Sequence, residues 1–349
     1  MKNKTFNINR LIRTNIKALK SYTSARDEFQ SMDNDMVFLD ANENPFDNGL
    51  NRYPDPNQIQ LKSLFSKIKE IPIENILLGN GSDEVLDLII RAFCEPNQDN
   101  VIILPPTYGM YKVLADVNAV ETIEVELFKN FQPRIQEIFN TSNSSSKILF
   151  LCSPNNPTGN SFNAIGVEEL LIKFKGIVII DEAYIDFTEQ ESWLKRLDEF
   201  PNLIITQTLS KAYGLAGIRL GICYASAEII SVLNSIKPPY NINELTQQKA
   251  IEQLSKSKVF NTQVTTILQE RELLLKSLRT IDMIETIYPT NANFVLIKVD
   301  DANKRYNQLI EKDIVVRNRT NQPLCTNCLR ITIGTEQENN KLIKTLKNL

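Results

Sequence analysis

The chain of 349 residues contains no histidine. Histidine is the usual proton-transfer partner of a catalytic serine or cysteine, so its absence excludes nucleophile schemes built on a Ser–His or Cys–His pair. Any side chain that moves a proton in a catalytic site of this chain must therefore be a lysine, a tyrosine or a carboxylate. The lack of histidine also weakens the case for zinc, which is usually held by histidine and cysteine.

Cysteine is scarce as well, with five residues, an odd number that does not suit a framework of disulfides. Cys94, Cys152 and Cys223 stand in apolar surroundings and are expected to be reduced residues of the core. Cys325 and Cys328 form one C-x-x-C motif without a second pair. Structural zinc sites usually need four such ligands, so the sequence predicts no metal site.

Charge of one sign and long hydrophobic runs are also missing. Lysine and arginine number 39 against 42 aspartate and glutamate residues, which leaves a net charge of −3 and no basic stripe. This balance argues against a nucleic-acid partner. The first residues lack the apolar core of a signal peptide, and no run approaches membrane-spanning length. We therefore expect a cytoplasmic protein without a membrane partner.

Glycine makes up only 11 of the 349 residues, about half of the usual share. Most of these glycines lie in or beside polar segments, namely Gly79, Gly81, Gly109, Gly159, Gly214, Gly217, Gly221 and Gly334. A chain that uses glycine so sparingly is expected to keep it where φ is positive or where the backbone passes close to another group.

Short apolar, β-branched runs predict seven strands, over residues 76–78, 101–104, 122–125, 147–152, 177–180, 203–206 and 220–224. Helical patterns precede or separate them, for example over residues 9–20, 108–117, 164–174 and 192–200. Strands that alternate with helices indicate an α/β fold with a mostly parallel sheet, covered by helices on both faces.

The pattern changes near residue 235. A long helical stretch over 244–278 precedes a smaller α+β region with strands over 293–299, 314–317 and 329–333 and helices over 304–311 and 336–346. The predicted domains are an N-terminal arm with part of the small domain over 1–45, a large domain over 46–240 and a small domain over 241–349. The length of the chain suits this division into two lobes.

Polar residues follow the ends of several predicted strands: Tyr108, Asn156, Asp181, Tyr184 and the loop that holds Lys211. Ligands of open α/β sheets bind at the carboxyl ends of strands, so we expect these side chains to surround one site. A lysine amine in a partly dry position can attack a carbonyl group.

Two loops suit a phosphate group. Thr208, Ser210 and Arg219 flank the lysine and offer hydroxyl and guanidinium donors. Residues 79–84 join a strand to a helix through a glycine turn, and Ser82 is the expected N-cap of that helix. The start of a helix binds anions well, although a capped helix without a ligand would have the same sequence pattern.

Taken together, these segments resemble the pyridoxal-phosphate-dependent aminotransferases of fold type I, and within them the histidinol-phosphate aminotransferase family. The matching segments occur in family order at residues 22–26, 39–45, 52–54, 79–84, 106–108, 154–159, 181–184, 208–212, 217–221, 316–317 and 329–334. The resemblance implies a large domain with a mostly parallel seven-stranded sheet covered by helices, plus a smaller α+β domain.

The resemblance also implies roles in binding pyridoxal 5'-phosphate. Lys211 would be the Schiff-base lysine and then the proton-transfer base, while Asp181 would keep the pyridine nitrogen protonated. Asn156 and Tyr184 would hydrogen-bond the ring oxygen, and Tyr108 would stack on the ring.

The cofactor phosphate would be held by Ser82, the backbone of Asp83, Thr208, Ser210 and Arg219, with Tyr53 of the neighbouring subunit. This last contact implies a homodimer with shared active sites.

The implied reaction converts L-histidinol phosphate and 2-oxoglutarate into imidazole-acetol phosphate and L-glutamate, a step of histidine biosynthesis. Tyr22, Asn42, Arg317 and Arg330 would bind the substrates. A threonine-phosphate decarboxylase or an aromatic amino acid aminotransferase of the same fold would share nearly all the cofactor motifs. A non-catalytic pyridoxal-phosphate-binding regulator is a further alternative, against which the retention of Lys211 and Asp181 argues.

Overall fold

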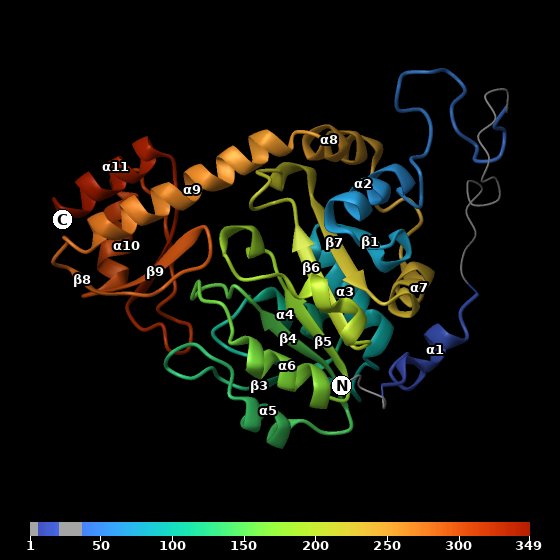
Figure 1. Cartoon of the computed structure of the whole chain (residues 1–349), viewed down its shortest axis with the longest axis horizontal. Coiled ribbons are helices and arrows are strands. Elements are labelled where there is room, and N and C mark those ends of the chain that lie inside the picture. The colour runs from blue at the N-terminus through green and yellow to red at the C-terminus, as the bar shows by residue number, and fades with distance from the viewer. Residues whose placement is uncertain (1–5, 21–36) are drawn as a thin grey trace.

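Two β-sheets organise the computed structural model, which describes residues 6–20 and 37–349. In Figure 1 the larger sheet fills the body of the molecule and the smaller one lies at the end that carries the C-terminus. No helix in the described ranges is long and apolar enough to cross a membrane.

The first sheet has seven strands in the order β1-β7-β6-β5-β4-β2-β3. Its strands are β1 (Ile76–Asn80), β2 (Asn100–Ile103), β3 (Glu121–Glu124), β4 (Ser146–Cys152), β5 (Ile177–Asp181), β6 (Leu203–Thr208) and β7 (Leu220–Ala225). All neighbours pair in parallel except β7, which runs antiparallel to both β1 and β6. The seven predicted strands and the mostly parallel sheet are thus confirmed.

Helices cover both faces of this sheet, and the buried side chains of its inner strands alternate between the two cores. Val178 and Ile180 of β5 pack into one core, whereas Ile177 and Ile179 pack into the other, as the two-residue period of a strand requires. One face is covered by α2 (Ile59–Lys69), α6 (Ala164–Lys173), the shorter α5 (Ile135–Thr141) and the 3₁₀ helix η5 (Trp193–Glu199). The other face is covered by α3 (Ser82–Phe93), α4 (Met110–Val117) and α7 (Ala227–Ile236).

The second sheet is antiparallel, with four strands in the order β10-β11-β9-β8. Its strands are β8 (Ile284–Ile287), β9 (Phe294–Val299), β10 (Arg317–Asn318) and β11 (Cys328–Thr332), and its helices are α10 (Ala302–Ile310) and α11 (Glu336–Leu346). Helices α8 (Glu244–Leu254) and α9 (Ser257–Leu278) run along the molecule from the first sheet to the second (Figure 1). The domain boundaries at residues 45 and 240 stay a prediction.

Three local predictions were wrong. The expected helix over 9–20 is instead a 3₁₀ turn, η1 (Ile8–Arg10), and one turn of helix, α1 (Thr14–Lys17). Arg13 interrupts it because its backbone N–H donates to Ala92 and its guanidinium pairs with Glu95. The stretch over 244–278 breaks into α8 and α9, and β10 begins only at Arg317. A fourth strand of the small sheet, β8, was not predicted.

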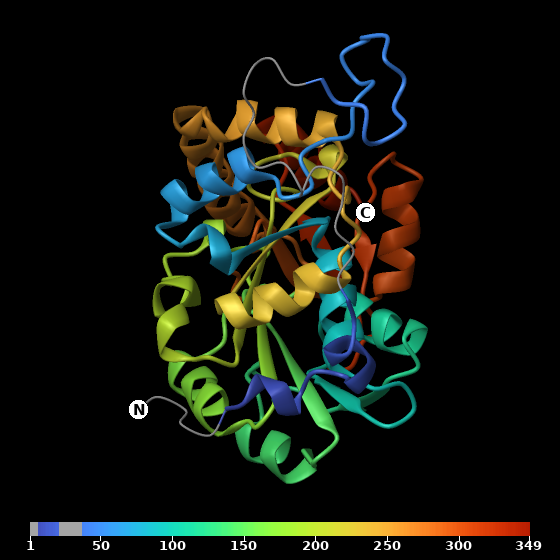
Figure 2. The same ribbon diagram turned by 90° about the vertical axis from the view of Figure 1, so that its right-hand side faces the viewer.

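The segment of residues 37–54, called the arm below, projects as a loop away from the body of the molecule (Figures 1 and 2). Large apolar side chains on it are exposed: Val37, Leu39 and Phe46 each keep at least 80% of their surface accessible. Such a stretch is unusual for a surface that faces only water.

All five cysteines are buried, and none of them forms a disulfide bond. Among the described residues there is no group of histidine, cysteine or carboxylate side chains arranged to hold a metal ion.

Candidate active site

A cleft of about 490 Å³ lies where β4, β5 and β6 end, and the β10–β11 hairpin of the second sheet closes its far side. Twelve of the predicted site residues line it: Ser82, Asp83, Tyr108, Asn156, Asp181, Tyr184, Thr208, Ser210, Lys211, Arg219, Arg317 and Arg330. The position at the carboxyl ends of parallel strands is the expected one for this class of fold.

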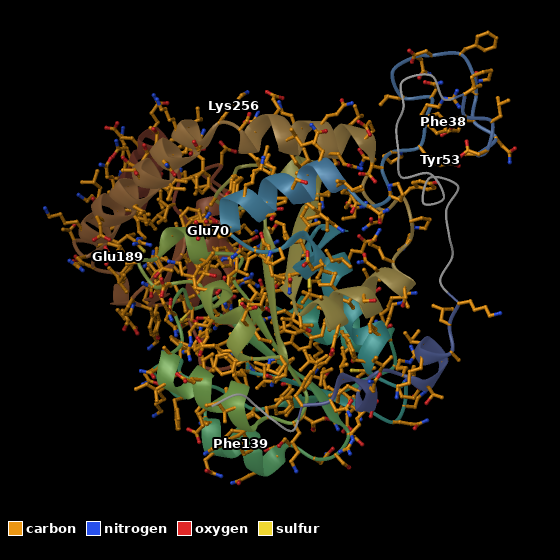
Figure 3. The ribbon with its side chains drawn as sticks, turned by 45° about the vertical axis from the view of Figure 1, so that its right-hand side comes forward. Phe38, Tyr53, Glu70, Phe139, Glu189 and Lys256 are labelled. Carbon is orange, nitrogen blue, oxygen red and sulfur yellow. The ribbon has the colours of Figure 1, made fainter. Side chains whose placement is uncertain are left out.

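The other three predicted residues are not in this cleft. Tyr22 lies outside the described residues. Asn42 and Tyr53 line a separate hollow of about 460 Å³ between the arm and the start of α8. Tyr53 stacks on Tyr240 with 4.4 Å between ring centroids, and Figure 3 shows it near Phe38 of the same arm. Within one chain, therefore, the arm does not contribute to the cleft.

Asp181 is the buried acid of the cleft. It ends β5 with only 4% of its surface accessible. The Tyr111 hydroxyl donates to its Oδ2 at 2.7 Å, and the backbone N–H of Ala183 donates to Oδ1 at 3.2 Å. Burial raises the pKa of Asp181, and the hydrogen bond from Tyr111 partly opposes this rise.

Tyr111 is a site residue that the sequence did not indicate. It is fully buried on α4, and its ring stacks on Phe150 with 4.6 Å between centroids. Its place in a helical apolar pattern is typical of a core residue, and the hydroxyl contact to Asp181 becomes visible only in three dimensions. A buried tyrosine hydroxyl generally needs a polar partner, which is the one available signal.

Lys211 follows β6 at the open side of the cleft, where it is exposed. Its Nζ lies 5.7 Å from the centroid of the Tyr184 ring. The cleft walls desolvate the amine, and this effect, together with the positive charge of Arg330, lowers the pKa of Lys211 although Asp181 opposes the change. A lowered pKa makes the neutral, proton-accepting amine more accessible.

The start of α3 differs from the prediction in one respect. Gly81, with φ of 79°, occupies the N-cap position, so Ser82 is the first helical residue and not the cap. No side chain caps this end within the described ranges. Asp83 in the first turn accepts a hydrogen bond from the Tyr108 hydroxyl at 3.0 Å. The uncapped first turn leaves α3 able to bind an anion.

The Lys211 loop packs tightly against this helix start. The Thr208 hydroxyl accepts from the backbone of Ser210 at 3.1 Å, and Arg219 reaches within 3.8 Å of Asp83. A Cβ atom at Gly221 would lie 2.3 Å from the backbone nitrogen of Ser82. The glycine therefore permits β7 to pass directly against the first turn of α3.

This contact gives a stability prediction with an internal control. Gly221→Ala is expected to lower the free energy of unfolding by about 1–3 kcal/mol, because the new methyl group must push α3 aside. Gly217→Ala lies four residues earlier, in the short 3₁₀ helix η6 (Ala216–Ile218), where nothing approaches within 4 Å of the added Cβ, and is expected to be nearly neutral. Denaturant melts of both variants check this, and equal stabilities would refute it.

Arg317 and Arg330 are cross-strand neighbours on β10 and β11. Arg330 donates a hydrogen bond through Nη1 to the side-chain oxygen of Asn156, and so connects the second sheet to the loop after β4. Arg319 and Gln322 also line the cleft and were not predicted. The Arg-x-Arg spacing was the available signal for Arg319, since residues two apart on a strand share a face.

Comparison with known proteins agrees with this geometry. A family model described as aminotransferase class I and II matches residues 35–346. A histidinol-phosphate aminotransferase of Flavobacterium johnsoniae is 63% identical over 346 residues, which cover 99% of either chain.

Solved structures agree as well. The histidinol-phosphate aminotransferase from Clostridium acetobutylicum superposes with a TM-score of 0.79 at 27% identity, covering 86% of this chain and 90% of that one. The enzyme from Sinorhizobium meliloti, solved in complex with pyridoxal-5'-phosphate, shares the fold with a TM-score of 0.76 at 20% identity, covering 85% and 82%. The chain thus belongs to the class I and II aminotransferases, whose cofactor is pyridoxal phosphate.

Proposed function

We propose that this chain transfers the amino group of L-histidinol phosphate to 2-oxoglutarate, giving imidazole-acetol phosphate and L-glutamate. Three relatives that are 63%, 63% and 60% identical to it, each over 99% of this chain, are named histidinol-phosphate aminotransferase. The observation that carries the proposal is the cleft itself, where a lysine of lowered pKa and a buried carboxylate lie opposite an arginine hairpin.

The residues of the cleft fit pyridoxal phosphate. The cofactor has a basic ring nitrogen, a flat ring, an aldehyde and a phosphate group. Asp181, buried and acidic, suits the ring nitrogen, and Lys211 suits the aldehyde. The phosphate group suits the uncapped start of α3, together with the hydroxyls of Ser82, Thr208 and Ser210 and the guanidinium of Arg219.

Pyridoxal phosphate, when bound, draws electrons from the substrate carbon next to the amine and makes its proton removable. The protein must then move that proton and keep the reacting groups in place. Lys211 is the only lysine among the cleft residues, and its lowered pKa suits it to accept a proton and return it. Asp181 would hold a proton at the ring nitrogen of the bound cofactor, while Asn156, Tyr184 and Tyr108 would position its ring.

The arginine hairpin is the anion-binding side of the cleft. Guanidinium groups bind phosphate and carboxylate through paired N–H donors, so Arg317 and Arg330 suit both substrates of the two half-reactions. Histidinol phosphate brings one phosphate, and glutamate brings two carboxylates. Tyr22 is proposed to bind the substrates together with these two arginines.

A homodimer with shared sites is part of the same proposal. The arm exposes apolar side chains, and its Asn42 and Tyr53 lie outside the cleft of their own chain. A second copy that packs against the arm would cover this apolar surface and bring Tyr53 to the phosphate end of the partner's cleft.

Subunit mixing tests this sharing. The variants Lys211→Ala and Tyr53→Ala are each expected to have low activity alone. Lys211→Ala lacks the catalytic amine, and Tyr53→Ala lacks the contact to the phosphate end of the partner's cleft. Refolded together, they form mixed dimers in which one cleft of each pair is intact, so activity should recover to about one quarter of the wild-type level. A mixture no more active than its components would show that the clefts are not shared, and sedimentation checks that dimers form.

Glutamate formation from histidinol phosphate and 2-oxoglutarate tests the reaction itself. We expect the purified enzyme to require both substrates. Release of carbon dioxide from threonine phosphate without glutamate formation would point to a decarboxylase, and a preference for phenylalanine or tyrosine would point to an aromatic aminotransferase.

A further inference from the structure

The arginine side of the cleft contains one more guanidinium than the assigned roles use. Arg319 follows Arg317 by two residues, and its backbone N–H donates to the carbonyl of Cys328 at 2.9 Å, which extends the β10–β11 pairing by one residue. Side chains two apart on a strand point to the same face. Arg317, Arg319 and Arg330 therefore all face the cleft, which each of them lines.

The positive charges of these three arginines have no opposite charge beside them within the described residues. In the part of the chain that the structure describes, no carboxylate forms an ion pair with any of them. Burial, followed by repulsion from Arg317, lowers the pKa of Arg319, and burial followed by repulsion from Arg319 lowers that of Arg330. Like charges held this close destabilise the ligand-free protein.

Their hydrogen-bonding capacity is also unused. The Nε atoms of Arg319 and Arg330 are buried without a partner among the described residues. A buried N–H group without an acceptor costs free energy, and because both of these side chains line the cleft, a ligand bound there would supply the missing acceptor. One N–H group of Arg330 already donates to Asn156, so Arg330 has fewer hydrogen-bond donors available for the substrate.

The chemistry of the ligand follows from this donor set. A phosphate monoester carries two negative charges on three terminal oxygens, each able to accept several hydrogen bonds, whereas a carboxylate carries one charge on two oxygens. We propose that Arg319 is a third phosphate-binding residue of the cleft, which makes the enzyme favour substrates with a phosphate monoester over those without one. This inference rests on the proposed function, because it concerns the same substrate.

Arg319→Gln tests the inference, with Arg319→Lys as a second variant that keeps the charge but loses the fork of donors. We expect Arg319→Gln to raise KM for histidinol phosphate roughly ten- to a hundredfold, with kcat within about threefold of wild type. Turnover of histidinol, which lacks the phosphate, should hardly change, so the preference for the phosphorylated substrate should fall. Arg319→Lys should recover part of it.

The matched control is Asn318→Ala. Asn318 lies between the two arginines in sequence, but its side chain donates to Asn303 at 2.7 Å on the other face of the hairpin. This variant should keep the wild-type preference, which shows that the hairpin tolerates substitution. Thermal melts establish that all variants fold.

A binding measurement separates this inference from the proposed function. Calorimetric titration of the holoenzyme with inorganic phosphate should give an affinity at least about fivefold weaker for Arg319→Gln than for wild type. If the wild type does not act on histidinol phosphate, the proposed function fails, and the phosphate titration still decides the role of Arg319. Equal phosphate affinity in wild type and Arg319→Gln would overturn the inference.

Discussion

Replacing Lys211 by alanine is expected to lower the rate of transamination by roughly a thousandfold or more, because one amine both bonds to the cofactor and transfers the proton. Among the described residues that line the cleft, no other lysine is present to replace this amine. The chain has no histidine, and burial raises the pKa of Tyr184 far above neutrality, so its hydroxyl stays protonated. The rate of glutamate formation under substrate saturation measures the loss.

Two further variants serve as controls. One keeps the positive charge at position 211, and the other removes a lysine elsewhere in the chain. Lys211→Arg keeps the positive charge but not a titratable amine, and should be as inactive as the alanine variant. Lys195→Ala removes an exposed lysine that pairs with Glu191 and does not line the cleft, and should behave as wild type. Substantial activity in Lys211→Arg would mean that charge alone, and not proton transfer, is what position 211 supplies.

Asp181→Asn is the prediction with the next largest effect. An amide can keep the hydrogen bond from Tyr111 but cannot hold a charge opposite the cofactor's ring nitrogen. We expect kcat to fall roughly a hundred- to ten-thousandfold. KM for both substrates should change little, since Asp181 does not lie on the arginine side of the cleft. An unchanged kcat would exclude the proposed role.

The stability of the Asp181→Asn variant should not fall as its kcat does. Burial raises the pKa of Asp181 in the folded, cofactor-free protein, so its contribution to stability is complete below the ordinary aspartate pKa and is lost as pH rises through the folded pKa. At neutral pH, cofactor-free Asp181→Asn should therefore be at least as stable as wild type, and this advantage should vanish in acid.

Asp186→Asn is the matched control for this stability effect. Burial raises the pKa of Asp186 as well, but Asp186 does not line the cleft. Its replacement should alter stability in the same direction and leave kcat unchanged. Denaturant melts at several pH values, alongside the activity assay, separate the two positions.

Much of the sheet and of the cleft could be predicted because both depend on short-range patterns. Strands covered on both faces appear as continuous apolar runs, and β5, at Ile177–Asp181, is fully buried along its length. Asp181 then follows from the general rule that ligands bind where parallel strands end. The same rule predicts that Asn156, Tyr184 and Lys211 meet in one cleft, as they do.

Most of the errors concern contacts between distant parts of the chain. Ser82 is a good N-cap by type, but Gly81 takes that position with a φ of 79°, a conformation that glycine adopts without strain. Arg13 interrupts its predicted helix to pair with Glu95, which is remote in sequence. Tyr111 resembles a core residue in every local respect. The last two of these features depend on contacts between residues that are distant in the sequence, so the pattern of neighbouring residues does not reveal them.

The position of the arm shows a different limit. Tyr53 was linked to the cofactor phosphate by family resemblance alone, and in a single chain it stacks on Tyr240 outside the cleft. The proposed contact of Tyr53 with the cofactor phosphate of the neighbouring subunit is therefore tested on the assembled dimer, by the subunit-mixing experiment.

Reduction of the holoenzyme with borohydride, followed by mass mapping of its peptides, tests the role of Lys211 most directly. The reagent makes the bond between a lysine amine and the cofactor permanent, without any need for turnover. We expect the cofactor to be found on the peptide that contains Lys211 and to be missing from the same peptide of Lys211→Arg. Attachment to a different lysine, or to none, would contradict the assignment of this cleft as the active site.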